Sequence, residues 1–344
     1  MAQPQNQAAW ITAPNKKPFD IQDAPYPSPG LGELVIKSAA TAINPVDWQI
    51  QARDQGFLKY PFILGEDVAG VVVEVGPEVT RFSKGQRVLA YLDGLGTGNP
   101  AHSSFQLYVL AKEILTAEIP DSVAFEQAAV LPIALATSAA GLFQEDALNF
   151  PLPSAEEPKP TGKTVLVWGG ASSVGATAIQ LAVAAGLTVI STASSKNFEL
   201  VKSLGVSEVY DYKSPSVIED VVNAISGTDF AGVFDAISET STFDAVRAIL
   251  AKLESNVKVV TTSPYDRPTE QPGPKFVIAV TVAQDPHKHV AKAIWNDFVP
   301  KALENGRLKT KPNPEVVGKG LHDIQHAVDV LKEGVSAKKI VVNF

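Results

Sequence analysis

The first third of the chain carries short runs of β-branched and other apolar residues, separated by stretches rich in proline and glycine. Residues 34–38, 67–75 and 87–91 have the length and composition of strands, and turn-forming segments such as 27–33 punctuate them. Short strands separated in this way favour a partly closed antiparallel barrel. The pattern therefore predicts a β-dominated N-terminal domain.

From about Glu126 the hydrophobic pattern changes. A helix-like stretch at 126–143 leads through a proline-rich loop, 151–160, into short apolar strands that alternate with amphipathic helices. The expected strands are 164–168, 188–192, 208–211, 232–236 and 258–262, and the expected helices between them are 173–185, 198–204, 216–225 and 242–252. This alternation predicts a parallel sheet covered by helices on both faces, which is a doubly wound α/β domain.

The last part of the chain does not continue this alternation of strands and helices. A helix-like stretch at 290–305 is followed by an extended segment at 309–317, a helix at 321–332 and a strand at 339–343, which suit a return to the first domain. A chain of 344 residues is also too long for one hydrophobic core. We therefore expect a discontinuous first domain, residues 1–125 with 295–344, and a second domain, residues 126–294, inserted into it.

The composition of the chain excludes several kinds of site and partner. The chain has no cysteine, which excludes disulfides, cysteine-bound zinc, iron–sulfur clusters and a thiolate nucleophile. Its formal net charge is −8 and it has no basic cluster, so nucleic acid is not an expected partner. The N-terminus lacks a basic-then-apolar signal pattern, and the longest uncharged apolar stretch, 128–143, is shorter than the about 20 residues of a spanning helix. A cytoplasmic protein without a membrane partner is the expectation.

A glycine-rich turn follows the first expected strand of the second domain. The sequence Gly169-Gly170-Ala171-Ser172-Ser173-Val174-Gly175 leads directly into an apolar helix. Glycine lets the backbone turn sharply and lets a pyrophosphate approach the amides at the helix N-terminus. Ser172 stands where the GxGxxG fingerprint has its middle glycine, but the outer glycines keep their spacing and two hydroxyls are added. The strand–turn–helix setting favours a dinucleotide site over a purely structural turn.

The end of the second expected strand bears on which nicotinamide cofactor is bound. An NAD enzyme places an acidic residue about 20 residues after the turn, on the ribose 2′-hydroxyl. This chain has Ser194, Ser195 and Lys196 there, and its next carboxylate is Glu199, inside the following helix. Two hydroxyls and a lysine suit a 2′-phosphate. The alternative is that Lys196 only caps a loop, but the missing acid argues independently for NADPH.

An ordered series of motifs runs along the whole chain. They are 42–47 (AINPVD), 61–72 (PFILGEDVAGVV), 75–76 (VG), 84–88 (KGQRV), 128–132 (AAVLP), the glycine turn, 331–334 (LKEG) and 336–341 (SAKKIV). In this series the chain resembles the zinc-free branch of the medium-chain dehydrogenase/reductase superfamily. It is most similar to fungal zinc-binding-dehydrogenase-domain proteins and trans-acting enoyl reductases, and less similar to quinone oxidoreductases. The resemblance implies a GroES-like, partly open β-barrel catalytic domain and a Rossmann domain that binds NADP.

The chain departs from the metal-dependent members of that superfamily. Zinc alcohol dehydrogenases have a cysteine ligand near the position of Asn44 and a His-Glu pair after the glycine at the position of Gly65. This chain has Asn44-Pro45 and Gly65-Glu66-Asp67 at these positions, and it lacks the lobe of four structural cysteines. No catalytic zinc is therefore expected.

The resemblance also implies roles for individual residues. Cofactor contacts are expected from Pro45, Val46 and Trp48, from Gly170, Ser172, Ser173, Val174 and Gly175 at the phosphates, from Ser194, Lys196 and Tyr212 at the 2′-phosphate, and from Val260 and Thr261 beside the nicotinamide. Substrate contacts are expected from the segments 131–138 and 276–280, here Leu131, Ser138, Phe276 and Ile278. For Tyr212 the alternative is an aromatic ring packed at a strand end.

Without a metal to polarise an oxygen atom, hydride delivery to an already activated acceptor is the chemistry that remains. Backbone amides, the cofactor ribose and Thr137 or Ser138 are candidate donors to a developing enolate, and water can supply the proton. Asn44 and Asp47 are the best polar candidates near the cleft, unless they only fix their loop. Three functions stay open: an NADPH-dependent enone or enoyl thioester reductase, a quinone oxidoreductase, and an NADPH-binding protein without turnover.

The expected partner is a small-molecule substrate, either free or as an acyl chain bound to a carrier. The apolar run 275–282 is typical of an edge strand, which can pair with a second subunit or line the substrate cleft. A monomer and a homodimer both stay open.

Overall fold

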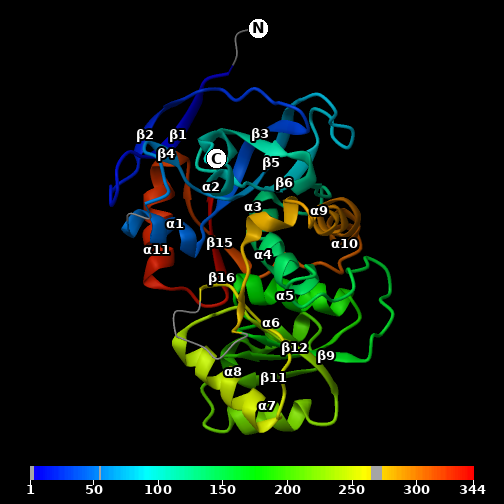
Figure 1. Ribbon diagram of the computed structural model, residues 1–344. Coiled ribbons are helices and arrows are strands. Elements are labelled where there is room, and N and C mark those ends of the chain that lie inside the picture. The colour runs from blue at the N-terminus through cyan, green and yellow to red at the C-terminus, as the bar shows by residue number, and fades with distance from the viewer. Residues whose placement is uncertain (1–3, 54–55, 265–272) are drawn as a thin grey trace. The chain divides into compact units, whose positions relative to one another are not determined.

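The chain divides into two compact units. The computed structural model describes residues 4–53, 56–264 and 273–344. One unit consists of Met1–Ile133 and Asn313–Phe344, and the other of Ala134–Pro312. The first unit therefore contains both the blue and the red end of the chain in Figure 1.

The first unit is built on two sheets. Its larger sheet has the order β15-β16-β3-β5-β6-β8, and β7 pairs with β3 beside this path. These strands are β3 (Glu33–Ala42), β5 (Asp67–Val75), β6 (Arg87–Tyr91), β7 (Tyr108–Lys112), β8 (Thr116–Glu118), β15 (Asn313–Lys319) and β16 (Lys338–Asn343). The smaller sheet has the order β2-β1-β4, with β1 (Asn6–Ile11), β2 (Asp20–Ala24) and β4 (Phe62–Ile63). All pairs are antiparallel except β15 with β16.

Alternating side chains of these strands form the core of the first unit. Leu34 and Ile36 of β3 pack with Val88 and Ala90 of β6 in one buried cluster, as the two-residue period of a strand requires. The strands predicted at 34–38, 67–75 and 87–91 all form. The helices of this unit are α1 (Pro45–Ala52), α2 (Gly94–Thr97), α3 (Phe125–Ala128) and α11 (Ile324–Glu333). Helices α1 and α11 contact each other, so the C-terminal segment returns to the first unit.

In the part of the second unit that the structure describes, six strands form one parallel sheet. Its order is β11-β10-β9-β12-β13-β14, formed by β9 (Lys163–Trp168), β10 (Thr188–Ala193), β11 (Glu208–Asp211), β12 (Asp229–Asp235), β13 (Val259–Thr261) and β14 (Lys275–Phe276). Numbered along the chain this is the order 3-2-1-4-5-6 of a Rossmann domain. The order reverses between β9 and β12, and ligands of such sheets bind outside the carboxyl ends of the strands at that point.

Helices cover both faces of this sheet, as predicted. The helices of this unit are α4 (Pro132–Phe143), α5 (Ser173–Ala184), α6 (Phe198–Ser203), α7 (Val217–Ile225), α8 (Thr240–Lys252), α9 (Lys288–Ala291) and α10 (Val299–Glu304). Val233 of β12 packs with Val221 of α7 and Val246 of α8 in one cluster. The next residue, Phe234, points to the other face, where a Cβ atom at Gly141 of α4 would lie 2.4 Å from its ring. Figure 1 shows α7 and α8 on the side of the sheet away from α4 and α5.

The unit boundaries differ from the expected ones at two places. Residues 126–133 lie with the first unit, where α3 contacts β3 and β5 and the amide of Ile133 donates to Asp67 Oδ1 at 2.6 Å. Residues 295–312 lie with the second unit. Asn305 Nδ2 donates to the carbonyl oxygen of Ala155 at 2.8 Å, and the amide of Lys309 donates to Gln180 Oε1 at 2.7 Å. The expected cut at 294/295 would divide a continuous helical segment, since a π-helical stretch, η5 (Lys292–Phe298), joins α9 to α10.

Two predicted elements take a different form. The helix predicted at 126–143 is divided into α3 and α4, because Pro132 lacks an amide hydrogen and begins the second helix. The strand-like run 275–282 is only β14 followed by a 3₁₀ helix, η4 (Ala279–Ala283). There Thr281 Oγ1 donates to the carbonyl oxygen of Ile278 at 2.7 Å, a local bond that competes with sheet pairing. By length and composition Phe125–Phe143 could cross a membrane, and 78% of this window is buried inside the structure, as in the core helix of a folded domain.

Candidate functional site

The glycine turn lies at the carboxyl end of β9, at the point where the strand order reverses. Gly169 has a φ of +82°, which favours glycine. A Cβ atom at Gly170 would lie 2.3 Å from Ser191 Oγ, and one at Gly175 would lie 2.2 Å from the carbonyl oxygen of Gly169. The turn is therefore closed tightly against β10 and against itself, and side chains are excluded from it.

The N-terminus of α5 leaves hydrogen-bond donors unused. Ser172 is the N-cap, and its Oγ accepts a hydrogen bond from the amide of Gly175 at 3.0 Å. The amides of Ser173 and Val174 have no partner within the helix, as at any helix start. Ser173 Oγ is buried and has no hydrogen-bond partner among the described residues. Unused donors at a positive helix end fit a bound phosphate.

The neighbouring strand β10 fixes the turn from the side. Thr192 accepts the amide of Gly169 on Oγ1 at 3.1 Å and the amide of Gly170 on its carbonyl oxygen at 2.8 Å. Ser194 then begins the 3₁₀ turn η3 (Ser195–Asn197), which contains Lys196. The predicted 2′-phosphate residues therefore follow β10 directly.

The end of β11 brings an acid and a further base to the same place, because Ala193 pairs with Asp211 in the parallel sheet. Asp211 accepts the amide of Lys213 at 2.9 Å and that of Ser195 at 3.3 Å, and these bonds, the one from Lys213 first, lower its pKa. Tyr212 is 45% exposed, so it is not packed at the strand end, and Lys213 Nζ lies 5.8 Å from its ring centroid. The sequence reasoning did not assign Asp211 or Lys213, although strand pairing was the signal for both.

The ends of β12 and β13 complete this edge of the sheet. Asp235 is fully buried, accepts the amides of Ile237 and Ser238 at 3.0 Å each, and has a pKa that burial raises. Thr261 Oγ1 is buried without a hydrogen-bond partner among the described residues, and Val260 is fully buried beside it.

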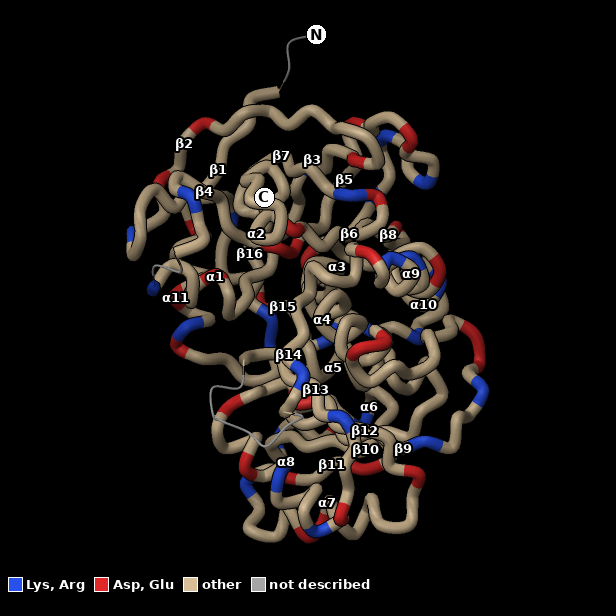
Figure 2. The backbone as a smooth tube through the Cα atoms, viewed as in Figure 1, with Lys and Arg blue, Asp and Glu red and all other residues tan. Residues whose placement is uncertain are grey.

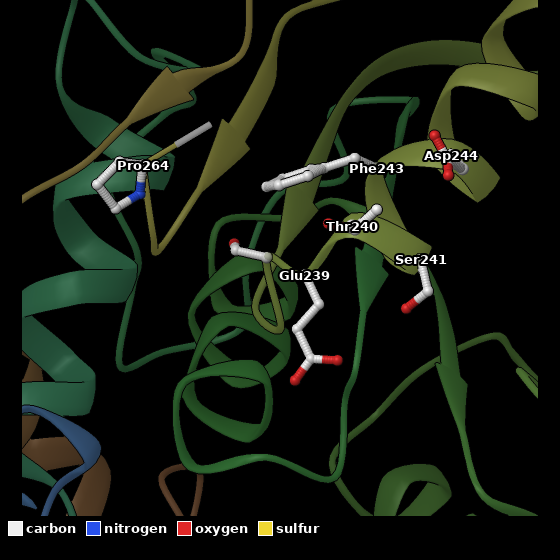
Figure 3. Close-up of a pocket in the computed structure, with 7 residues that line it drawn as sticks. Glu239, Thr240, Ser241, Phe243, Asp244 and Pro264 are labelled. Carbon is white, nitrogen blue, oxygen red and sulfur yellow. The ribbon is translucent and has the colours of Figure 1, made fainter. Parts of the chain in front are cut away.

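An open pocket of about 670 Å³ lies beyond β12, lined by Ser238, Glu239, Thr240, Ser241, Phe243, Asp244 and Pro264. In Figure 3 the ring of Phe243 points across this pocket toward Pro264. The sequence reasoning assigned none of these residues, which come from the turn after β12, the first residues of α8 and the segment after β13.

The predicted substrate segments have mixed environments. Leu131 and Ser138 are fully buried and Thr137 is 9% exposed. Ser138 Oγ donates to the carbonyl oxygen of Val174 at 3.0 Å, so its proton is already committed. Ile278 is 50% exposed, and Phe276 of β14 is partly buried.

In the first unit Asn44 and Asp47 are held in a buried polar network. Asn44 is the N-cap of α1, the helix that contains Pro45, Val46 and Trp48. Asp47 accepts the amide of Asn44 on Oδ2 at 2.7 Å and the amide of Gly65 on Oδ1 at 3.2 Å. Asn44 Nδ2 donates to Asp67 Oδ2 at 2.8 Å, and Lys339 Nζ donates to Asn44 Oδ1 at 2.5 Å and lies 3.1 Å from Asp67 Oδ2. Asn44 and Asp47, two of the predicted catalytic residues, therefore have structural partners that fix their loop.

This network contains more acids than bases. In Figure 2, which colours Asp and Glu positions red along the backbone, red segments lie between the labels β16 and β6. Asp47, Glu66, Asp67 and Asp93 are each at most 5% exposed, and Lys339 is 4% exposed. Burial raises the pKa of Asp47 to about 7, and it raises the pKa of Glu66 well above its usual range, with the charges of the neighbouring carboxylates adding to the shift. Across the described ranges, no group of three or more His, Cys, Asp or Glu side chains is placed to hold a metal ion.

A Rossmann sheet with a glycine turn at its first βα junction, joined to a discontinuous barrel-like unit, defines a nicotinamide-dependent dehydrogenase or reductase. Residues 30–121 match the family described as "Alcohol dehydrogenase GroES-like domain", and residues 173–267 match "Zinc-binding dehydrogenase". The chain is 42% identical to "Dehydrogenase pigH" of Monascus ruber, over 99% of this chain and 100% of the relative. It is 43% identical to "Trans-enoyl reductase himH" of Aspergillus japonicus, over 98% and 97%.

Among solved structures, an alcohol dehydrogenase superfamily protein from Novosphingobium aromaticivorans is similar with a TM-score of 0.78 and 25% identity, over 98% of this chain and 99% of that chain. The chain belongs to the medium-chain dehydrogenase/reductase superfamily and is an oxidoreductase. Dehydrogenases of this superfamily use nicotinamide cofactors. The predicted fold class, a GroES-like barrel domain with a doubly wound Rossmann domain, is confirmed.

Proposed function

We propose that the chain is an NADPH-dependent reductase that adds hydride to an activated carbon–carbon double bond, in an enone or an enoyl thioester, without zinc. The similarity to the trans-enoyl reductase of Aspergillus japonicus supports this substrate class, because 43% identity extends over 98% of the chain. The donors and cations at the carboxyl ends of β9, β10 and β11 carry the cofactor half of the proposal.

The preference for NADPH rests on charge and on free hydrogen-bond capacity. Lys196 and Lys213 stand at the ends of β10 and β11, where Asp211 is the acid that the neighbouring backbone binds. Asp211 stands at the end of β11 rather than at the end of β10, where an NAD enzyme places its acid, and its carboxyl oxygens already accept two backbone amides. This edge of the sheet therefore has two lysines and the Ser194 hydroxyl against one carboxylate that already binds backbone amides. Its excess of positive charge and hydrogen-bond donors suits a 2′-phosphate.

The donor set of the first unit argues against zinc. A zinc site needs deprotonated nitrogen, sulfur or carboxylate ligands with free lone pairs. The chain has no cysteine, and Lys339 Nζ contacts both Asn44 Oδ1 and Asp67 Oδ2. A lysine cation therefore occupies the centre of the polar network, and the substrate must carry its own activation.

The chain's own residues would bind and position the cofactor and the substrate. When bound, the reduced nicotinamide supplies the hydride. Ser173 and Val174 would hold the pyrophosphate through their amides and the Ser173 hydroxyl, and the buried Thr261 hydroxyl would meet a polar group beside β13. Ser138 holds α4 against α5 rather than donating to substrate.

Steady-state oxidation of NADPH over enones, enoyl thioesters and quinones tests this function. We expect turnover with the first two classes, a clear preference over NADH, and no loss of rate after treatment with a zinc chelator. Enoyl thioesters of pantetheine and of a carrier protein, compared at equal concentration, would show whether a carrier-bound acyl chain is preferred. Turnover with quinones alone, or NADPH binding without turnover on any acceptor, would overturn the proposal.

A further inference from the structure

A serine hydroxyl joins strands β12 and β13 of the Rossmann sheet just beyond the end of their backbone pairing. The two strands pair as far as Asp235 and Thr261. One residue further, the amide of Thr262 donates to Ser238 Oγ at 2.8 Å, and Thr262 Oγ1 lies 3.2 Å from the same oxygen. The Ser238 side chain therefore continues the contact between the carboxyl ends of these strands.

The turn that carries Ser238 has an unusual backbone conformation. Ser238 has a φ of +55°, in the left-handed region that few residues other than glycine adopt. The buried Asp235 holds it there, because its Oδ1 accepts the amides of Ile237 and Ser238 at 3.0 Å each and its carbonyl oxygen accepts Ser238 Oγ at 2.8 Å. Such a conformation persists only where its surroundings fix it. Since Ser238 Oγ donates its hydrogen to Asp235, its lone pairs are left for Thr262.

The same two segments border open space. Ser238 and Glu239 come from the turn after β12 and Pro264 from the segment after β13, and all three line the pocket of about 670 Å³ (Figure 3). Thr262 lies two residues before Pro264 in the chain. Its hydrogen bonds to Ser238 therefore fix the spacing between the two segments beside this pocket.

The proposed cofactor pose puts the nicotinamide half of the dinucleotide over these strand ends. In that pose the N-terminus of α5, after β9, holds the pyrophosphate, and Lys196 and Lys213, after β10 and β11, hold the 2′-phosphate. In the strand order β11-β10-β9-β12-β13 these three strands stand on one side of the point where the order reverses. Because a Rossmann sheet binds a dinucleotide across that point, the other half of the cofactor extends over β12 and β13.

We propose that Ser238 is a positioning residue for the nicotinamide ring, which rests on the NADPH-binding part of the proposed function. Its hydroxyl holds the end of β13 against the end of β12, and these ends support the nicotinamide half of the cofactor. Without this hydroxyl the amide of Thr262 loses its acceptor, and the end of β13 is free to move. Hydride transfer is sensitive to such movement, because a displacement of about 1 Å can cost about 100-fold in rate.

The test compares Ser238→Ala and Ser238→Gly with Ser255→Ala, which changes a serine just after the C-terminal end of α8. Alanine removes the hydroxyl and keeps the Cβ atom. Glycine also removes the hydroxyl but favours the left-handed backbone, so this variant keeps the turn without strain. At saturating NADPH, with the acceptor that the wild type reduces fastest, we expect kcat to fall by about 10–100-fold in both Ser238 variants. The KM of the acceptor should stay unchanged, and Ser255→Ala should behave as the wild type.

Two binding measurements need no turnover. Adenosine 2′,5′-bisphosphate carries the 2′-phosphate but no nicotinamide, so its dissociation constant should be the same in the wild type and in both Ser238 variants. The dissociation constant of NADPH should rise by about fivefold, the share of one hydrogen bond. The polarised fluorescence of bound NADPH comes from the reduced nicotinamide ring, and it should show faster local motion of this ring in both Ser238 variants.

Equal weakening of NADPH and the bisphosphate in both Ser238 variants would overturn the role of Ser238, because the loss would not be confined to the nicotinamide half. Unchanged kcat and unchanged ring motion in both variants would overturn it as well. Both results leave the reductase function intact. A wild type that binds NADPH but reduces no enone or enoyl thioester would overturn the proposed reaction, and the ring motion would still decide the role of Ser238. A wild type that does not bind NADPH would overturn both.

Discussion

Lys339 is the residue whose removal should most clearly damage the first unit. Its ammonium group donates to Asn44 Oδ1 and lies 3.1 Å from Asp67 Oδ2, and the lysine is 4% exposed while Asp67 is fully buried. In Lys339→Met the methionine fills much the same space, but the Asp67 carboxylate loses its cation. Breaking a buried ion pair by removing one partner costs about 3–5 kcal/mol, and the abandoned amide oxygen of Asn44 adds about 1 kcal/mol. We therefore expect a loss of about 4–6 kcal/mol in the free energy of unfolding of this unit.

Unfolding in guanidinium chloride, followed by tryptophan fluorescence, measures this loss. Hydrogen exchange, followed for peptides of each unit separately, shows which unit loses stability. The protection of backbone amides from hydrogen exchange should be lost first in β16 and around Asn44, because Lys339 joins these segments. The double variant Lys339→Met/Asp67→Asn removes the unpaired charge and should recover about half of the loss. An unchanged unfolding midpoint in Lys339→Met would refute the reasoning. So would a double variant that loses more unfolding free energy than its two single changes together.

Three further predictions concern other parts of the two units. Burial raises the pKa of Asp47 to about 7 from 3.8, so between these pH values the folded chain keeps a proton that the unfolded chain has lost. The free energy of unfolding should therefore fall by about 4 kcal/mol as the pH rises through this window. Asp47→Asn should remove this part of the pH dependence. Gly170→Ala places a Cβ atom 2.3 Å from Ser191 Oγ and should cost about 1–3 kcal/mol in calorimetric stability, with weaker binding of both nicotinamide cofactors. Lys196→Ala and Lys213→Ala should each raise the dissociation constant of NADPH by about tenfold in titration calorimetry and leave that of NADH unchanged.

Each of these has a matched control and a contradicting result. Glu118→Gln should keep the pH slope, and a wild type whose stability rises between pH 4 and 7 would show that Asp47 is ionised. Adding Ser191→Ala to Gly170→Ala removes one contact atom and should recover part of the stability, so no recovery would contradict Ser191 Oγ as the main source of the clash. Lys252→Ala, an exposed lysine paired with Glu219, should bind NADPH normally. Equal weakening of NADPH and NADH by the Lys196 and Lys213 changes would contradict their assignment to the 2′-phosphate.

Much of the fold follows from local pattern. The strand–turn–helix at 163–184 is specified by an apolar run, glycines and a serine N-cap, and each of these acts within a few residues. The missing acid after β10 is likewise visible in the chain itself. Boundaries were less predictable where long-range contacts decide them: residues 295–312 have the helical pattern expected, but hydrogen bonds from Asn305 and Lys309 tie them to the second unit.

The chemistry of the buried acids could not be obtained from the sequence. Asn44, the pair Gly65 and Asp67, and Lys339 come from three segments distant along the chain, and nothing in the local sequence of Lys339 indicates that it joins the other two in one buried network. The ionisation of Glu66 depends on which charges surround it and on how little water reaches it. Similarly, Asp211 and Lys213 meet the end of β10 only because the two strands are parallel and in register.

The sequence by itself determined the two-unit α/β architecture, the glycine turn and the absence of cysteine ligands, because hydrophobic period, glycine geometry and residue chemistry are local properties. The tertiary structure alone decided which polar groups are satisfied and which are not. It committed Asn44, Asp47 and Ser138 to structural hydrogen bonds, and it left the Ser173 and Thr261 hydroxyls buried without partners among the described residues. The physical reason is that burial and pairing are set by contacts between distant segments, and these fix the charge of a carboxyl group more strongly than its own neighbours in the chain do.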